Sequence, residues 1–177
     1  MHNIIMLGPP GTGKGTQAER VAKRLDIPHI STGDMFRQLY EEGNPIGVEA
    51  KDKYWGKGNL VPDDITIRLV EERLKKEDCK SGFILDGFPR TIPQAEALDR
   101  ITTIGKAIDI ESSDKTIEER LTSRRQCRKC KRIYGMHIKP KEDGTCDKCG
   151  GEIYQRDDDR IEVIKEGLRS TGSRQSH

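Results

Sequence analysis

The stretch Gly8-Pro9-Pro10-Gly11-Thr12-Gly13-Lys14-Gly15-Thr16 directly follows the apolar residues 4–7 and leads into a helical pattern that begins near Lys14. Glycines let backbone N–H groups converge on one point, where an anion meets the positive end of the helix and the charge of Lys14. Gly8, Gly13 and Lys14 match P-loop spacing, but Gly15 stands where Ser or Thr is usual, and the hydroxyl follows at Thr16. We therefore predict a phosphate-binding turn between a buried strand and a helix; the alternative is a purely structural glycine-rich turn.

Composition restricts the class of protein. The 177 residues suffice for one core domain with insertions. Because 32 basic residues oppose 30 acidic ones, net charge gives no reason to expect a nucleic-acid or membrane partner. No apolar run approaches membrane-spanning length, and residues 1–7 lack the basic start and long apolar stretch of a secretion signal. We therefore expect a polar protein of the cytoplasm.

After the glycine-rich stretch, helical and strand patterns alternate. Residues 17–25 carry apolar side chains at helical spacing, and residues 27–30 resemble a second strand, which together favour a βαβ unit and a parallel sheet. Glycines and prolines break residues 43–62, as in a small mobile flap. Asp63 and Asp64 are then expected to cap a helix over residues 65–76.

Two further stretches suggest anion and metal binding. Ser31 or Thr32 can cap a helix with Arg37 about one turn further on, which forms a second anion site if Arg37 is not simply a solvated residue. Asp86 ends an apolar strand where open α/β sheets bind ligands, so it could hold Mg²⁺ directly or through water, or equally cap a helix. Arg90 follows as a candidate phosphate clamp. Two phosphate sites favour transfer between two nucleotides over hydrolysis.

The cysteines indicate a metal site. Cys127 and Cys130 form one Cys-x-x-Cys pair, Cys146 and Cys149 form another, and fifteen residues separate the pairs. This spacing predicts tetrahedral Zn²⁺ in a closed, structural site, with four unmetallated thiols as the alternative. Cys79 is expected to be a semi-buried apolar residue.

Taken together, these motifs resemble the adenylate kinase family in order and spacing over residues 1–168. The residues that carry the resemblance are Gly8-x-Pro10-Gly11-x-Gly13-Lys14-Gly15-Thr16, Ser31 through Arg37, Leu60-Val61-Pro62-Asp63, Asp86 through Thr91 with Gln94, and the four cysteines. The resemblance implies a three-layer α/β fold with a parallel sheet, a flap that binds a nucleoside monophosphate, and a small zinc lid. It also implies a cis peptide between Phe88 and Pro89.

The resemblance assigns a role to each matching residue. The phosphates of ATP would be held by Gly11, Gly13, Lys14, Gly15, Thr16, Arg120 and Arg124. AMP would be bound by Thr32, Gly33, Arg37, Leu60, Val61, Gly87, Arg90, Gln94 and Arg156, with Thr32 and Gln94 reading the adenine. Asp34 and Asp86 would anchor hydrated magnesium. The catalytic set would be Lys14, Arg37, Asp86, Arg90, Arg124 and Arg156, and Asp158 and Asp159 would be the paired acids at the hinge.

The family pattern also implies domain boundaries. The core would contain residues 1–29, 62–125 and 158–177, the flap residues 30–61, and the zinc lid residues 126–157. A strand over 81–88, a helix over 91–104, an unusually short strand over 107–111 and a helix over 115–125 would complete the part of the core before the lid.

The C-terminal part departs from the family. Gly167-Leu168 stands where the family has an arginine before a leucine, and no continuing helix is expected after Leu168. Residues 169–177 have no apolar side chain, yet synonymous codons permit a shifted reading, Val-Tyr-Arg-Glu-Gln-Thr-Glu-Pro, that resembles the family. This suggests the hypothesis of a lost base. The expected consequences are an open sheet edge, low stability and weak activity, unless another copy covers that edge.

The function implied by the resemblance is reversible phosphoryl transfer from ATP to AMP, giving two ADP, with Mg²⁺ and structural Zn²⁺ as cofactors. Three alternatives remain at the level of sequence: a kinase for another nucleoside monophosphate, a non-catalytic nucleotide-binding protein, and a zinc ribbon that binds RNA. The basic run behind the last alternative consists of Arg124, Arg125, Arg128, Lys129, Lys131 and Arg132. We expect no nucleic-acid or membrane partner, and either a monomer or an oligomer of unknown size.

Overall fold

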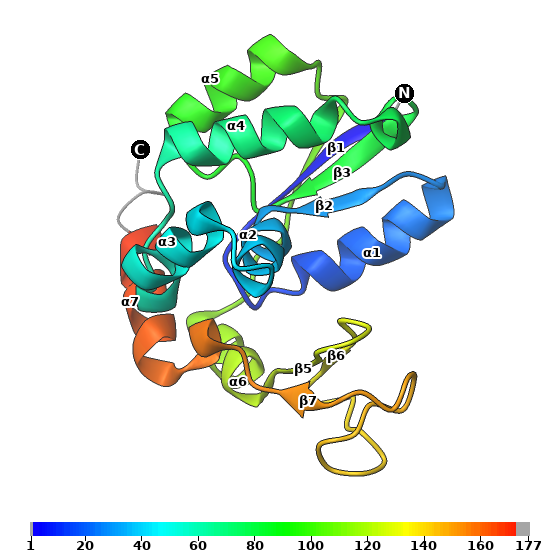
Figure 1. The fold of residues 1–177 in the computed structure, drawn as a ribbon, viewed down its shortest axis with the longest axis vertical. Coiled ribbons are helices and arrows are strands. Elements are labelled where there is room, and N and C mark those ends of the chain that lie inside the picture. Colours follow the sequence, from blue (N-terminus) through cyan, green and yellow to red (C-terminus); the bar gives the residue numbers. More distant parts are fainter. Residues whose placement is uncertain (1, 173–177) are drawn as a thin grey trace. The chain divides into compact units, whose positions relative to one another are not determined.

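The computed structural model describes the backbone of residues 2–172 and the side chains as far as residue 166 (Figure 1). Contacts divide the chain into two compact units. The first contains the described residues up to Gly8, then Gly13–Trp55 and Leu60–Glu111. The second contains Pro9–Thr12, Gly56–Asn59 and the described residues from Ser112 onward.

A four-stranded parallel sheet forms the centre of the first unit, as predicted. Its strands are β1 (His2–Leu7), β2 (His29–Ser31), β3 (Gly82–Asp86) and β4 (Lys106–Asp109), in the order β2-β3-β1-β4. In the register of the sheet, Asp86 lies beside Met6 on one side and Ser31 on the other, while Asp109 lies beside Leu7. The carboxyl ends of all four strands therefore meet at one edge, directly before the glycine-rich stretch.

Helices cover both faces of this sheet (Figure 1). Helix α1 (Lys14–Leu25) buries Ala18 and Ala22 against one face. Helices α4 (Asp63–Leu74) and α5 (Ile92–Ile101) pack Val70 and Leu98 against the other. Successive side chains of a strand point to opposite faces, so neighbouring residues of β1 enter different halves of the core.

Some helix ends differ from the sequence-based expectation. Helix α4 begins at Asp63, so Asp63 and Asp64 lie in its first turn instead of capping it, and Pro62 takes the cap position. Helix α5 ends at Ile101 because Thr102 is extended. The short 3-10 helix η2 (Glu77–Cys79) then leads into β3, and Cys79 is buried as expected.

The segment expected to form the flap contains α2 (Thr32–Glu41), α3 (Pro45–Lys53) and the 3-10 helix η1 (Trp55–Lys57). Its own small core consists of Phe36, Ala50 and Val61. A Cβ on Gly47 would collide with the backbone of Leu39 and Tyr40, so glycine lets α2 and α3 approach closely.

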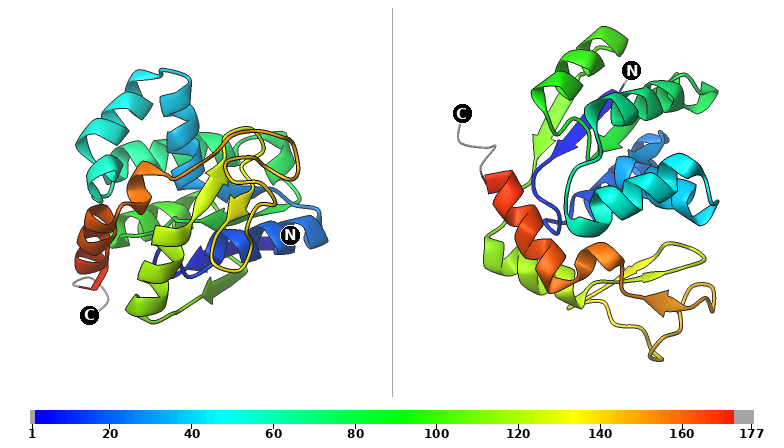
Figure 2. Two further views of the ribbon diagram at one scale, coloured as in Figure 1. Left: turned by 90° about the horizontal axis from the view of Figure 1, so that it is seen from below. Right: turned by 60° about the vertical axis from the view of Figure 1, so that its left-hand side comes forward.

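The second unit combines helices with a small antiparallel sheet. Its elements are α6 (Asp114–Ser123), β5 (Arg125–Cys127), β6 (Ile133–Tyr134), β7 (Ile153–Tyr154), η3 (Asp157–Asp159) and α7 (Ile161–Gly172), and the sheet order is β6-β5-β7. Helices α6 and α7 lie side by side and share a core of Ile117, Leu121 and Ile164 (Figure 2).

Helix α7 corrects one expectation, because it continues past Leu168 to Gly172. Residues 169–171 contain neither proline nor glycine, so nothing in that stretch breaks the helix. Residues 173–177, on which most of the shifted-reading hypothesis depends, lie outside the described part of the chain. Within residues 2–172, no helix has the length and apolar character needed to cross a membrane.

Candidate nucleotide and metal sites

The glycine-rich stretch has the backbone of an anion-binding turn. Gly8, Gly11 and Gly13 have φ angles of +116°, +82° and +101°. L residues that carry a side chain rarely adopt such positive φ angles. Gly13 is the N-cap of α1, and in the described structure no side chain caps the helix there. A Cβ on Gly13 would meet nothing within 4 Å, so the positive φ, and not crowding, favours glycine at this position. The first N–H groups of a helix have no partner within the helix, so they are available to an anion.

Asp86 explains why glycine occupies position 15. A Cβ on Gly15 would lie 3.2 Å from Asp86 Oδ2, so a serine or threonine there would press on the carboxylate. Asp86 is largely buried at the end of β3, and Nε2 of His29 lies 3.4 Å from its Oδ2 without hydrogen-bond geometry. The structure thus brings Asp86 against the phosphate turn and adds a neighbour, His29, that no sequence motif marks.

The second candidate anion site forms at the start of α2. Ser31, and not Thr32, caps the helix, since its hydroxyl accepts from the N–H of Asp34 at 3.3 Å. The Arg37 guanidinium donates to Asp34 Oδ1 at 2.8 Å. A Cβ on Gly33 would lie 2.8 Å from Arg37 Nη2, so the absence of a side chain there gives Arg37 its place over the helix start.

Thr32 and Arg90 converge on one carbonyl. Thr32 Oγ1 donates to the carbonyl of Gly87 at 2.9 Å, and Arg90 Nε donates to the same oxygen at 2.8 Å. Gly87 has φ +82°, and the peptide between Phe88 and Pro89 is cis, as expected. The structure therefore brings Thr32 and Arg90 together, although 58 positions separate them along the sequence.

Gln94 is 2% exposed and uses both ends of its amide. Its Oε1 accepts from the backbone N–H of Arg90 at 2.8 Å, and its Nε2 donates to Asp63 Oδ1 at 2.7 Å. Asp63 was expected to be a helix cap, and its contact with Gln94 was missed because no local pattern indicates it. Nearby in sequence, Leu60 is half-buried, and the side chain of Val61 is packed into the flap core.

In the second unit, α6 contacts the middle of the glycine-rich stretch. Arg120 Nη1 donates to the carbonyl of Thr12 at 3.0 Å. A Cβ on Gly11 would lie 2.8 Å from Leu121 Cγ, so only glycine permits this close approach. Arg120 is thereby fixed against the turn by the backbone itself.

The arginines after α6 have buried partners. Arg124 Nε donates to Asp159 Oδ2 at 2.8 Å, and Arg124 Nη2 donates to the other oxygen, which makes the pair bidentate. Asp159 is completely buried, and this burial raises the pKa of its carboxyl group although Arg124 opposes the shift. Arg156 is also buried, and its Nε donates to Gln126 Oε1 at 2.8 Å.

The four paired cysteines form a compact cluster. The Sγ atoms of Cys127, Cys130, Cys146 and Cys149 all lie within 4.8 Å of one another, which allows them to hold a metal ion. Tyr134 donates a hydrogen bond from its hydroxyl to Cys146 Sγ at 3.3 Å, and this bond lowers the pKa of the Cys146 thiol to about 6. A thiol that deprotonates readily is a better metal ligand.

The first strand of the parallel sheet runs through an anion-binding turn into a helix, and a carboxylate stands at the end of the adjoining strand. This arrangement is that of a P-loop nucleotide kinase. Comparison with known proteins agrees, since the adenylate kinase family model matches residues 6–176. The chain is 51% identical over 173 residues to an adenylate kinase of Archaeoglobus fulgidus, covering 94% of this chain and 79% of that protein. It is 52% identical to one of Carboxydothermus hydrogenoformans, covering 93% and 79%, and 54% identical to one of Brevibacillus brevis, covering 94% and 80%. The chain belongs to the adenylate kinase family.

Proposed function

We propose that this chain transfers a phosphoryl group reversibly between ATP and AMP, giving two molecules of ADP. The observation that carries the proposal is the presence of a second phosphate-competent cluster, Arg37 and Arg90 with Thr32, in addition to the phosphate turn. A hydrolase needs one nucleotide site, whereas transfer between nucleotides needs a donor and an acceptor site.

The donor nucleotide is assigned to the phosphate turn and α6. Backbone N–H groups at Gly11, Gly13, Gly15 and Thr16 face the phosphates, and Lys14, Arg120 and Arg124 supply positive charge. Little covalent chemistry is required, because phosphoryl transfer is accelerated mainly by positioning and by stabilising charge on the transferring group.

The acceptor nucleotide is assigned to the flap and the residues that follow β3. Arg37 and Arg90 hold the AMP phosphate with Arg156, while Thr32 and Gln94 read the adenine next to Gly33, Gly87 and the backbone of Leu60 and Val61. The hydrogen bond from Gln94 to Asp63 supports this role, since an amide held in one orientation discriminates between bases better than a mobile one. In this scheme residues 30–61 are the flap and residues 126–157 are the lid.

Two metals are part of the proposal. Oxygen donors suit Mg²⁺, and the position of Asp86 beside Gly15 supports its role in holding the ion through water, with Asp34 as the second carboxylate. Bound magnesium would neutralise charge on the phosphates. Four thiolates suit tetrahedral Zn²⁺, and a closed set of four leaves no position for a reacting water, so the zinc is structural.

A coupled assay of ADP formation from ATP and AMP, with and without Mg²⁺, tests the proposal. We expect magnesium-dependent turnover, with AMP preferred in a panel of nucleoside monophosphates. No turnover of any monophosphate would refute the proposal, and a preference for another base would refute the assignment of Thr32 and Gln94.

The acceptor assignment has its own test. Arg90→Ala and Arg37→Ala are expected to weaken AMP binding by about 1.5 to 3 kcal/mol each, because each removes a charge-assisted contact. ATP binding should change little. Equal losses for both nucleotides in calorimetry would contradict the assignment.

A further inference from the structure

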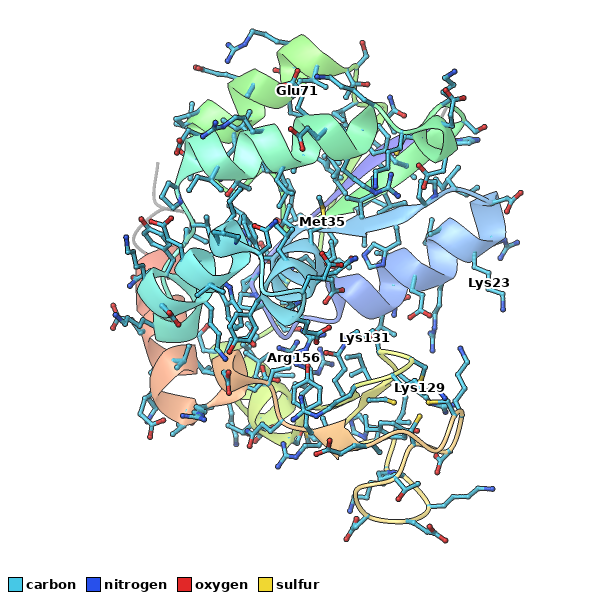
Figure 3. All side chains as sticks on the ribbon, viewed as in Figure 1. Lys23, Met35, Glu71, Lys129, Lys131 and Arg156 are labelled. Atoms are coloured by element: carbon cyan, nitrogen blue, oxygen red, sulfur yellow. The ribbon has the colours of Figure 1, made fainter. Side chains whose placement is uncertain are left out.

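One buried amide links the turn over residues 127–131, here called the cysteine knuckle, to an arginine of the proposed lid. Gln126, in β5, is 2% exposed. Its Nε2 donates to the carbonyl of Lys131 at 3.1 Å, and its Oε1 accepts from Arg156 Nε at 2.8 Å and from the Tyr154 hydroxyl at 3.4 Å. Figure 3 labels Lys131 and Arg156, the two residues that Gln126 links.

The amide has only one orientation that satisfies all its contacts. The carbonyl of Lys131 can only accept and Arg156 Nε can only donate, so a flipped amide would lose both of these bonds. The carbonyl belongs to Lys131, whose positive φ of 59° closes the turn that starts at Cys127. Gln126 is therefore anchored on the knuckle, and its oxygen has a defined position.

Gln126 limits the freedom of the Arg156 side chain. An arginine side chain is long and flexible, and small displacements of a group that meets the transferring phosphoryl are costly in rate. The hydrogen bond from Arg156 Nε to the anchored amide oxygen of Gln126 fixes the plane of the guanidinium.

We propose that Gln126 is a positioning residue that holds the Arg156 guanidinium in the orientation required for phosphoryl transfer. The inference rests on the proposed function, in which Arg156 contacts the phosphates. Gln126 itself touches no substrate and acts only through Arg156.

The test is a double-mutant cycle in the metal-loaded protein. Gln126→Met keeps the length of the side chain and removes both polar ends. We expect kcat to fall about tenfold, with KM for ATP and AMP changed less than about twofold, because the lost contact acts in the transition state. In an Arg156→Lys background, which has no Nε–H to position, the same substitution should change kcat less than about twofold.

Matched controls separate positioning from damage to the lid. Glu152→Gln breaks the exposed ion pair with Arg128, just beyond the ends of β7 and β5, and should leave kcat unchanged. Zinc content is measured for every variant. If Gln126→Met loses the metal, Gln126→Asn is used instead, because it keeps the amide but withdraws its oxygen from Arg156.

The outcomes distinguish the two hypotheses. Equal losses of kcat in both backgrounds, or unchanged kcat in Gln126→Met, would overturn the positioning role. A parent chain that forms no ADP would contradict the proposed function. In that case hydrogen exchange at Arg156 Nε, measured by NMR, still decides whether Gln126 holds the guanidinium: exchange should be faster in Gln126→Met, and equal rates would refute the contact.

Discussion

Gly87 and Gly144 have almost the same backbone conformation, with φ of +82° and +80°, but different surroundings. A Cβ on Gly87 would lie 2.7 Å from Arg90 Nη2 and 2.9 Å from Thr32 Oγ1, whereas on Gly144 it would meet nothing within 4 Å. Gly87→Ala should therefore displace Arg90 and raise KM for AMP about tenfold or more, the loss of one charge-assisted contact.

Gly144→Ala is the matched control for this prediction. Both substitutions place an L residue in the left-handed region and should lower the free energy of unfolding by about 1–2 kcal/mol. Only Gly87→Ala should change the kinetics with AMP. An equal rise of KM in both variants would show that backbone strain, and not crowding of Arg90, is responsible.

The thiol of Cys79 should be inert. Cys79 is 5% exposed, and burial raises the pKa of its thiol although Arg73, whose Nη1 donates to Sγ at 3.0 Å, opposes the shift. Only thiolates react quickly with disulfide reagents. We expect the metal-loaded protein to show almost no reactive thiol at pH 8, and the unfolded protein to show all five cysteines. Rapid modification of Cys79 in the folded protein would contradict its burial.

At this scale, local motifs indicate candidate residues but not the contacts that those residues make. Lys14, Arg37 and Arg90 stand in recognisable stretches, because a phosphate site needs glycine, helix ends and cations in a fixed local order. No local pattern accounts for glycine at position 15, because the reason lies in Asp86, 3.2 Å from where its Cβ would be. The contact between Asp63 and Gln94 also depends on the packing of two helices, which no short pattern records.

Helices α4 and α5 are joined by that same contact, and its removal should be costly. Asp63→Ala leaves the buried amide nitrogen of Gln94 without its 2.7 Å acceptor, which should lower the free energy of unfolding by about 1–3 kcal/mol. KM for AMP should rise as well, because Gln94 loses its fixed orientation. Urea unfolding and steady-state kinetics measure both effects.

Asp64→Ala provides the comparison. Asp64 lies in the same first turn of α4, and its side chain is 71% exposed in an ion pair with Arg68. It shares the favourable interaction with the helix dipole but makes no buried contact, so its loss should cost less than about 1 kcal/mol. If the two variants were equally unstable, the interaction with the helix dipole would explain the loss of stability, and the hydrogen bond between Asp63 and Gln94 would not contribute.

Elements were more predictable than their ends. Apolar strands alternating with helical patterns indicated the parallel sheet, because parallel strands need a crossover connection, which is usually a helix. The start of α4 was misplaced because Asp63 and Asp64 favour both a cap and a first turn. Helix α7 extends beyond the expected limit because family resemblance, and not helix propensity, set that limit.

At the scale of the whole molecule, the two units should lose structure separately when the metal is removed. The binding energy of a structural metal is folding energy, and the cysteine cluster lies in the second unit. The single tryptophan, Trp55, lies in the first unit beside Tyr40, so its fluorescence reports on that unit. A strong chelator should release one zinc per chain. It should also lower the thermal midpoint followed by circular dichroism more than the midpoint followed by Trp55 fluorescence.

Two variants check this expectation. Cys149→Ser removes one ligand and should reproduce the effect of the chelator, whereas Cys79→Ala should retain one zinc per chain. Protein purified without chelator that contains no zinc would contradict the metal assignment. A single transition in both signals would contradict the independence of the units.

The close approach of Gly11 to Leu121 has a consequence for exchanging lids among relatives. Helix α6 leads into the segment that we propose as the lid, and its Leu121 side chain also packs against the middle of the glycine-rich turn, where a Cβ on Gly11 would collide with it. A chimera joined within α6 could therefore combine a turn from one parent with an ill-fitting helix from the other. Donor segments that begin after Ser123 would keep this contact native, so we expect the position of the junction to decide whether the glycine-rich turn of a hybrid keeps its shape.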